Sequence, residues 1–220
     1  MNMSLQGMGM TSLRTRERMI KRLSEQGIKN QRVLQVMRDT PRHIFMDEAL
    51  SSRAYEDTAL PIGYNQTISQ PYIVARMTEL LLETTGHLEK VLEIGTGCGY
   101  QTAILSPFVD RVYSIERILP LQRKARGHIG ELRLRNISYL YDDGNVGWPD
   151  YAPFNGIIAS AAPSEIPSQL MEQLAVGGVM VIPVGLNGQQ MLQRVTRKTS
   201  GYEVEEIEPV TFVPFLSGKE

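Results

Sequence analysis

A glycine-rich stretch, Gly95-Thr96-Gly97-Cys98-Gly99, directly follows a short run of strand character, Val91-Leu92-Glu93-Ile94. Glycine has no Cβ, so the backbone of such a turn can approach a ligand closely. The helical pattern that follows at Thr102 would point its first free N–H groups outward. A strand, a glycine turn and a helix in this order predict a cradle for a nucleotide-like ligand.

The residues around this cradle narrow the class of ligand. In the dinucleotide fingerprint G-x-G-x-x-G, the third glycine would fall at Tyr100, but Gly99 comes one position early. Glu93 lies shortly before Gly95, where a carboxylate would repel a pyrophosphate. A cationic ligand without phosphate suits the cradle better. S-adenosylmethionine, which carries a sulfonium and an ammonium group, has this chemistry.

Two further acidic positions fall where such a ligand needs hydrogen-bond acceptors. An acidic residue about 20 residues after the glycine turn, at the end of the second strand, holds ribose hydroxyls in nucleotide-binding folds. Glu116 stands at this point, and Asp143 follows the next predicted strand, where it would accept from an adenine amino group beside Gly144. The alternatives are a structural strand–helix turn with solvated acids and, at Asp142-Asp143-Gly144, a plain turn.

The elements that must position these residues alternate between strand and helix from Lys90 onward. This alternation predicts an α/β fold with a parallel sheet wound on both faces, whose ligand lies outside the carboxyl ends of the strands. Leu192–Val195 and Tyr202–Ile207 flank Ser200-Gly201 and predict an antiparallel hairpin at the sheet edge. The predicted strands are 90–95, 111–115, 137–141, 154–159 and 179–182, with helices at 99–107, 119–125 and 167–175, the last ending at Gly177-Gly178.

Helices also precede this core. A first helix is expected over about 12–26. A second helix begins after Asn30, which is a good N-cap, and ends before Pro41. A third helix begins at Pro71, because proline suits the first helical turn, and Thr84–His87 closes it.

The segment 59–71 is too long for a simple connector and is rich in Gly, Pro, Asn and hydroxyl side chains. Segments of this kind often bind ligands. Thr67 and Ser69 have two interpretations, as caps of the helix that follows or as hydrogen-bond partners of cofactor or substrate. Local chemistry alone favours the cap.

Length and composition limit the classes of function. The chain has 220 residues, 42% of them hydrophobic and 21% charged, which is typical of one globular α/β domain. A net charge of −1 gives no electrostatic footprint for nucleic acid or an anionic membrane. The single cysteine favours a reducing, cytoplasmic compartment, and the three histidines lack metal-ligand spacing. We expect neither a membrane span nor a signal peptide, and a loose N-terminus over residues 1–11.

Taken together, the motifs resemble those of the bacterial protein-L-isoaspartate(D-aspartate) O-methyltransferases over about residues 12–217. The loop motif Thr67-Ile68-Ser69-Gln70-Pro71 is far more specific than the glycine turn, which Rossmann-like methyltransferases share. The resemblance implies methyl transfer from S-adenosylmethionine to the free carboxylate of L-isoaspartyl residues in damaged peptides and proteins, which initiates repair through a succinimide. Further stretches that carry it are 59–63, 91–97, 99–103, 113–117, 147–149, 152–154, 166–167 and 181–185.

The resemblance also implies a class I methyltransferase fold and a set of site residues. The fold is a mostly parallel, doubly wound sheet with a rearranged antiparallel C-terminal edge and extra N-terminal helices. We expect one domain over 12–220, with a cofactor-binding core at 89–185, and family precedent favours a monomer. Ser69 is the expected catalytic residue. The expected cofactor-binding residues are Thr67, Ile68, Ser69, Glu93, Gly95, Thr96, Gly97, Glu116, Arg117, Asp142, Asp143 and Gly144.

The chain departs from the family pattern at a few positions. Asp142 stands where the family usually has glycine, which would reshape the adenine pocket slightly. Cys98 replaces a small residue that is commonly serine, and Asn155 replaces an aspartate. Asn65 stands where glycine is common and would stiffen the loop. None of these changes removes a residue expected to be essential.

Three other functions are compatible with parts of the pattern. An S-adenosylmethionine enzyme for a small molecule shares the cradle but not the Thr67–Pro71 loop. A nicotinamide oxidoreductase conflicts with Glu93 and the position of Gly99. A catalytically silent binding protein conflicts with the presence of Ser69 and Glu116. A repair enzyme must also accept many peptides, so we expect an extended substrate to pair with backbone at 59–70 or 210–215.

Overall fold

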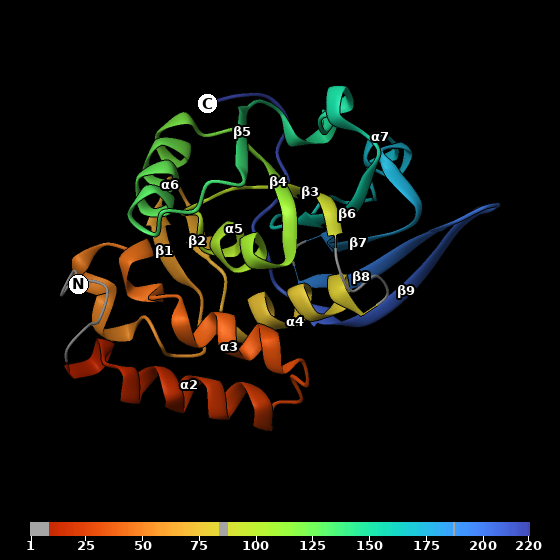
Figure 1. The fold of residues 1–220 in the computed structure, drawn as a ribbon. Helices are drawn as coiled ribbons and strands as arrows, with labels where there is room; N and C mark the ends of the chain where they lie inside the picture. The colour runs from red at the N-terminus through yellow and green to blue at the C-terminus, as the bar shows by residue number, and fades with distance from the viewer. Residues whose placement is uncertain (1–8, 84–87, 187) are drawn as a thin grey trace.

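A seven-stranded sheet forms the centre of the computed structural model, which describes residues 9–83, 88–186 and 188–220 (Figure 1). Its strands are β3 (Leu88–Ile94), β4 (Val109–Glu116), β5 (Ile137–Tyr141), β6 (Phe154–Ala159), β7 (Leu174–Leu186), β8 (Gln189–Lys198) and β9 (Gly201–Val210). Their order is β5-β4-β3-β6-β7-β8-β9, parallel from β5 to β7 and antiparallel at β8 and β9. The expected α/β sheet with an antiparallel C-terminal edge is confirmed.

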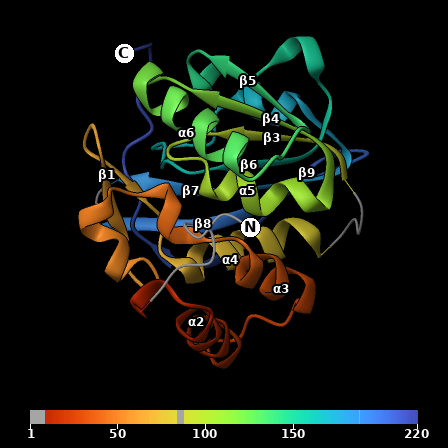
Figure 2. The same cartoon turned by 60° about the vertical axis from the view of Figure 1, so that its left-hand side comes forward.

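Helices cover both faces of the sheet, unequally. The larger hydrophobic cluster joins Val91, Val112 and Val181 of the sheet to the N-terminal helices and to the helices that follow β3 and β4. Figures 1 and 2 show these helices on one side. On the other face, Leu92 and Ile157 pack against one short helix and Phe215 near the C-terminus. The helices are α2 (Leu13–Glu25), α3 (Gln31–Asp39), α4 (Pro71–Leu82), α5 (Tyr100–Leu105), α6 (Leu119–Glu131) and α7 (Ser168–Glu172).

The N-terminal helices begin where local chemistry places them. The side chain of Asn30 accepts hydrogen bonds from the backbone N–H groups of Arg32 and Val33 at 3.1 and 3.2 Å, as an N-cap does. Pro71 occupies the first turn of α4. The predicted bounds of α2, α3 and the start of α4 are therefore confirmed, whereas the predicted close at Thr84–His87 lies outside the described residues. Residues 1–8 of the expected loose N-terminus also lie outside the described residues. Gly9–Thr11 forms a short 3-10 helix, η1.

The prediction for α7 and β7 is wrong at their boundary. The helix ends at Glu172, and β7 begins at Leu174 rather than after Gly177-Gly178. The pairing of β6 with β7 shifts between Phe154 and Gly156, so the glycines lie in an irregular part of the strand. Gly177 has a φ of +80°, which a β-bulge accommodates at low cost only with glycine. The glycines therefore mark a bulge and not a helix end.

The polar segment 59–71 contains a β-hairpin that the sequence did not predict. It consists of β1 (Leu60–Gly63) and β2 (Gln66–Ile68), paired antiparallel with Leu60 opposite Ile68. The turn residues Tyr64 and Asn65 have φ values of 54° and 55°. Asparagine tolerates this left-handed region, and a two-residue turn of this hand fits the twist of a hairpin. Thr67 therefore lies in an ordered element, and Ser69 directly follows its last residue, Ile68.

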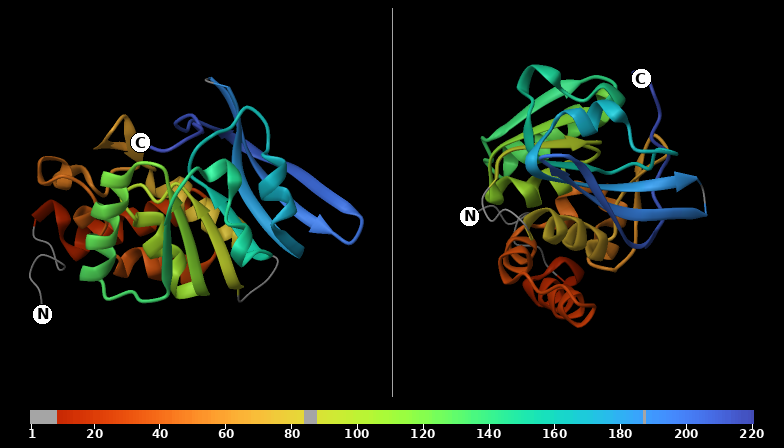
Figure 3. Two further views of the ribbon diagram at one scale, coloured as in Figure 1. Left: turned by 90° about the horizontal axis from the view of Figure 1, so that it is seen from above. Right: turned by 90° about the vertical axis from the view of Figure 1, so that its right-hand side faces the viewer.

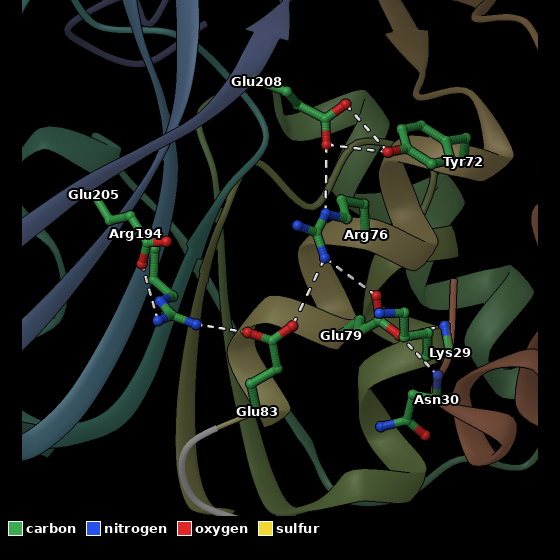
Figure 4. Close-up of polar contacts among 9 residues, drawn as sticks. All are labelled: Lys29, Asn30, Tyr72, Arg76, Glu79, Glu83, Arg194, Glu205 and Glu208. Carbon is green, nitrogen blue, oxygen red and sulfur yellow. Dashed lines mark hydrogen bonds and ion pairs between the residues drawn. The ribbon is translucent and has the colours of Figure 1, made fainter. Parts of the chain in front are cut away.

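A network of charged side chains joins α4 to α3 and to the C-terminal hairpin (Figure 4). One carboxylate oxygen of Glu79 accepts from the backbone N–H groups of Lys29 and Asn30, both at 2.7 Å, and the other lies 3.2 Å from Arg76. Arg76 also pairs with Glu208 of β9 at 3.4 Å. Figure 3 shows that the β8–β9 hairpin projects from the body of the protein. This network therefore helps fix the base of the hairpin to the N-terminal helices.

Replacing Glu79 tests the network. Glu79→Ala removes the acceptor of two backbone N–H groups, so we expect the free energy of unfolding to fall by about 3 kcal/mol. Urea unfolding followed by circular dichroism measures the loss, at an unchanged denaturant slope. Glu83→Ala is the matched control, because this side chain is 42% exposed in the same network. It should lose less than about 1 kcal/mol, and equal losses would contradict the assignment.

Among the residues that the structure describes, no helix combines the length and the apolar character that crossing a membrane requires.

Candidate active site

The glycine turn after β3 is held against the end of β4 by backbone hydrogen bonds. The N–H groups of Gly95 and Thr96 both donate to the carbonyl of Ile115, at 2.8 and 3.1 Å. Gly95 and Gly97 have φ values of 88° and 55°, and Gly99 has a φ of 91°. Residues with a Cβ rarely adopt this region. The alternation of glycine in the sequence therefore serves the path of the turn as well as its closeness to a ligand.

A cleft with about 630 Å³ of open space lies over this turn, at the carboxyl ends of β3, β4 and β6. Its walls come from the glycine turn, the ends of the strands, the β1–β2 hairpin and the C-terminal segment. They include Gln66, Thr67, Gly95, Gly97, Glu116, Arg117, Gly144, Ser160, Ala161, Pro214 and Phe215.

Glu116 faces this cleft with a fixed carboxylate. One oxygen accepts from the backbone N–H of Gly97 at 2.8 Å, and the other accepts from that of Ile118 at 2.9 Å. Burial raises the pKa of this carboxyl group, while the backbone hydrogen bonds oppose the shift. Each oxygen keeps a second lone pair for a ligand hydroxyl. The end of β4 therefore presents an oriented acceptor, as the sequence indicated.

Glu93 lies beneath the glycine turn and lines neither the cleft nor the space beside it. One of its oxygens accepts from the hydroxyls of Thr102 and Ser114, at 2.6 and 2.5 Å. The Ser114 hydroxyl lies 2.6 Å from that of Thr96 in the turn. The other oxygen of Glu93 has no partner in the described part of the chain, and burial raises the pKa to about 7. Glu93 thus supports the cradle from inside, and its direct contact with a ligand stays a prediction.

A second, smaller space of about 300 Å³ adjoins the cleft. The two share Thr67, Gly95, Gly97 and Ser160 as walls. The smaller one is also lined by Ile68, Ser69, Thr96, Tyr100 and Gln101. The structure therefore brings the predicted loop residues and the predicted cradle residues together around two connected spaces.

Ser69 does not cap α4. The N-cap position belongs to Gln70, which makes no side-chain capping hydrogen bond. Within residues 9–83, 88–186 and 188–220, the Ser69 hydroxyl has no hydrogen-bond partner, although its backbone carbonyl accepts one. The capping interpretation, which local chemistry favoured, is therefore wrong for this residue. Its hydroxyl is available to a ligand in the smaller space.

Gly144 lines the cleft, whereas the two acidic residues before it do not. Burial raises the pKa of Asp143. The backbone N–H groups of Gly218 and Asn145 donate to its carboxylate and lower the pKa, and the net shift is downward. Asp142 pairs with Lys219 at 3.4 Å. A Cβ on Gly144 would clash with Ile94 and approach the ring of Phe215 to 3.0 Å. The sequence motif therefore shapes this wall mainly through its glycine.

The C-terminal segment 213–220 closes one side of the cleft, which the sequence did not predict. Val213 and Phe215 exchange backbone hydrogen bonds with Ala162, each of 2.9 Å. Arg117 donates to the carbonyl of Gly218 at 2.9 Å and lies 3.2 Å from the Glu220 carboxylate. The sequence had indicated residues 210–215 only as backbone that could pair with a substrate peptide. In the structure, part of this backbone pairs with Ala162 of the protein itself.

Comparison with known proteins decides the family. The family model for protein-L-isoaspartate(D-aspartate) O-methyltransferase matches residues 14–220. The chain belongs to this family. A protein-L-isoaspartate O-methyltransferase of Cellvibrio japonicus is 60% identical over 219 residues, covering 99% of this chain and 98% of that protein. One of Methylobacillus flagellatus is 61% identical over 219 residues, covering 98% and 97%.

Solved structures agree with this membership. A protein-L-isoaspartate O-methyltransferase structure has a TM-score of 0.81 at 25% identity, covering 90% of this chain and 65% of that one. A Plasmodium falciparum structure, of a putative enzyme of the same name in complex with S-adenosyl-L-homocysteine, has a TM-score of 0.77 at 23% identity, covering 91% and 98%. The predicted family, methyltransferase class and fold are confirmed, and the nicotinamide alternative is excluded.

Three residues that depart from the family pattern, Asn155, Asp142 and Cys98, have well-defined surroundings in the structure. The Asn155 side-chain oxygen accepts from the backbone N–H of Lys90 at 2.9 Å, as a carboxylate would. The Asp142 carboxylate accepts from the N–H of Asp143 at 2.8 Å. Cys98 is buried, and burial raises the pKa of its thiol to about 11. No three His, Cys, Asp or Glu residues in the described ranges are arranged to hold a metal ion.

The buried Glu93 makes stability depend on pH. Its pKa is raised from 4.5 to about 7, so between these values the folded state holds a proton that the unfolded chain has lost. The contribution is largest below about pH 4.5 and is lost as pH rises through 7. We expect wild type to lose about 2 kcal/mol more than Glu93→Gln between pH 5.5 and 8. Urea unfolding at both pH values measures this, and parallel profiles would contradict it.

Proposed function

We propose that the cleft binds S-adenosylmethionine and that Ser69, in the adjoining space, holds the carboxylate that is methylated. The chain is a methyltransferase that esterifies the free carboxylate of L-isoaspartyl residues in damaged peptides and proteins. The observation that carries the assignment of the two spaces is their common wall of Thr67, Gly95, Gly97 and Ser160. A donor in one space and an acceptor in the other would meet at this wall.

The residues present fit S-adenosylmethionine, which supplies an electrophilic methyl group on a sulfonium. Gly95 and Gly97 allow close approach of backbone, and Glu116 presents an oriented acceptor for ribose hydroxyls. Gly144 lets Ile94 and Phe215 pack closely against it in the wall of the cleft, where a Cβ would clash with Ile94. The guanidinium of Arg117 is already engaged by Glu220, which suits a ligand without phosphate.

The remaining predicted cofactor residues would act from around the cleft. Ile68 and Thr96 line the smaller space, where they would border the reacting groups. Asp143 accepts from the N–H of Gly218 at 2.6 Å and so would hold the C-terminal segment beside the adenine. Asp142, paired with Lys219, would support the same segment. Glu93 would position the turn through Ser114 and Thr96.

The chemistry asks for alignment more than for a strong base. A carboxylate is already ionised at neutral pH, so no residue has to remove a proton from it. Ser69 would donate a hydrogen bond to one carboxylate oxygen and leave the other free to be methylated. Holding the two reactants in line and away from water can supply about 7–11 kcal/mol in favourable cases. The following backbone nitrogen can then attack the ester carbonyl, and the methoxy group leaves with the N–H proton as methanol, which closes a succinimide.

We also propose a monomeric, cytoplasmic enzyme whose residues 12–220 form one domain and which binds neither nucleic acid nor membrane. The larger hydrophobic cluster supports the single domain, because it joins Met19 and Val33 of the N-terminal helices to Val112 of the sheet. The net charge of −1 supports the absence of nucleic-acid and membrane binding, and the single cysteine supports a cytoplasmic location. The monomeric state rests on family precedent alone. An extended substrate peptide would run beside the β1–β2 hairpin, from which Ser69 follows.

The assay that tests the activity is radiolabelled methyl transfer to the isoaspartyl and aspartyl forms of one peptide. We expect label only in the isoaspartyl form, because the free carboxylate must reach Ser69 on a backbone shifted by one carbon. Equal labelling of both forms, or of neither, would overturn the proposal.

Ser69→Ala should lower kcat/KM for the isoaspartyl peptide about tenfold to hundredfold, the range for a lost hydrogen bond to a charged group. S-adenosylmethionine affinity, measured by calorimetry, should stay within about twofold, because the hydroxyl serves the acceptor. Ser52→Ala, at an exposed serine, is the control. A parallel loss of turnover and of cofactor affinity would give Ser69 a cofactor or structural role instead.

Gly144→Ala should weaken S-adenosylmethionine binding by about fivefold to 150-fold, because the added methyl group has to displace Ile94 or Phe215 at a cost of about 1–3 kcal/mol. Titration calorimetry measures the change. Gly127→Ala is the matched control, since no atom lies within 4 Å of a Cβ added there. Unchanged affinity in Gly144→Ala would remove this wall from the cofactor site.

A further inference from the structure

Arg42 is a buried arginine directly behind the smaller space. It lies in the short 3-10 helix η2 (Arg42–Phe45) and is 0% exposed. Its Nε donates to the carbonyl of Ala54 and its Nη2 to the carbonyl of Ser69, both at 2.8 Å. Its guanidinium carbon lies 4.8 Å from the centre of the Tyr100 ring. Two of its contacts, Ser69 and Tyr100, are walls of the smaller space.

An acid balances the charge of Arg42 only weakly, because burial lowers the pKa of the guanidinium more than Asp57 raises it. In the described part of the chain no carboxylate forms an ion pair with it, and its Nη1 has no hydrogen-bond partner. Burial lowers the pKa of the guanidinium, but arginine keeps its charge at neutral pH. The two carbonyl hydrogen bonds and the contact with the Tyr100 ring offset part of the cost of burying this charge, but none of them supplies the opposite charge that a buried ion needs. The folded protein therefore leaves part of the charge of Arg42 uncompensated.

The substrate of the reaction supplies the missing negative charge. The carboxylate that Ser69 would hold is anionic, and the ester that forms from it is neutral. A cation behind Ser69 attracts the anionic substrate, whereas it does not attract the neutral ester product in this way. Because the negative charge is consumed as the methyl group transfers, the cation favours the bound substrate over the transition state. Its charge should therefore act on KM more than on kcat.

We propose that Arg42 is a positioning and specificity-determining residue of the methyltransferase, which holds Ser69 by its carbonyl and selects a carboxylate over a neutral group in the smaller space. This inference rests on the proposed role of Ser69.

Two variants separate the charge from the hydrogen bonds. Arg42→Gln removes the charge, and Arg42→Lys keeps it while losing the forked contact with two carbonyls. The measured quantities are kcat and KM for an isoaspartyl peptide, and the inhibition constant of the same peptide with its free carboxylate replaced by a carboxamide. S-adenosylmethionine affinity reports whether each variant is folded.

The expected result is a change of selectivity. Arg42→Gln should raise KM for the carboxylate peptide about tenfold and reduce the preference for carboxylate over carboxamide by a similar factor. Arg42→Lys should retain most of this preference while lowering kcat, because the carbonyl of Ser69 is held less firmly. Arg32→Gln is the matched control. Arg32 also donates to a backbone carbonyl, of Pro107 at 2.7 Å, and lies 4.9 Å from an aromatic ring, but it is exposed and outside both spaces.

Each outcome either supports or overturns the proposed role of Arg42. A folded Arg42→Gln variant with unchanged preference overturns the inference, because a merely structural role would not involve the charge of the ligand. If Arg42→Gln does not fold, Arg42→Lys decides alone, since loss of the preference there overturns the inference and its retention with lower kcat supports it. Failure of the role of Ser69 is distinguishable, because Ser69→Ala would then turn over like wild type.

Discussion

The turn after β3 depends on a buried carboxylate that has little access to water. Glu93 accepts from Ser114 on the neighbouring strand and from Thr102 on the helix that follows. Ser114 in turn meets Thr96 of the turn, so one side chain links the strand, the turn and the helix that form the cradle. Buried polar groups are retained at a cost unless they are satisfied, and one oxygen of Glu93 is not. The path of the glycine turn is therefore fixed from beneath, and its upper surface is left to backbone and to Glu116.

The other walls of the site are built on this turn and come from distant parts of the chain. The side chain of Ile62 in the β1–β2 hairpin lies within 3.5 Å of where a Cβ of Gly97 would be. The ring of Phe215 in the C-terminal segment lies 3.0 Å from where a Cβ of Gly144 would be. The β1–β2 hairpin and the C-terminal segment thus both border the cleft above the glycine turn. Each of these two walls is held in place by its own contacts. Arg42 anchors the chain after the hairpin, whereas Arg117 and Asp143 anchor the C-terminal segment.

Much of this arrangement could be predicted from local sequence, and the rest could not, for physical reasons. The mostly apolar sequence of β6 and the local chemistry of Asn30 and Pro71 at helix starts act over a few residues, so the sequence pattern alone placed these elements. The hairpin turn at Tyr64-Asn65 lacks glycine, which hid its left-handed backbone. The inward orientation of Glu93 depends on which face of β3 meets α5, and the closing of the cleft by residues 213–220 depends on Ala162. These are tertiary facts that a local pattern does not contain.

Two buried ionisable side chains lie behind the walls of the site, and Glu93 is ionised only in part at neutral pH because its pKa is about 7. Glu93 is beneath the cradle, and Arg42 is behind Ser69, and both are set back from the spaces that the reactants would occupy. The reaction joins a cation and an anion into neutral products, so strong unpaired charges against both reactants would hold them too firmly. Charges behind the walls still set which reactant favours which space, because low dielectric carries their field through the wall. The contact surface consists mostly of glycine, hydroxyl and backbone groups, with Glu116 and the paired Arg117 in the cleft. These groups can align the acceptor with the methyl group and then release an uncharged ester.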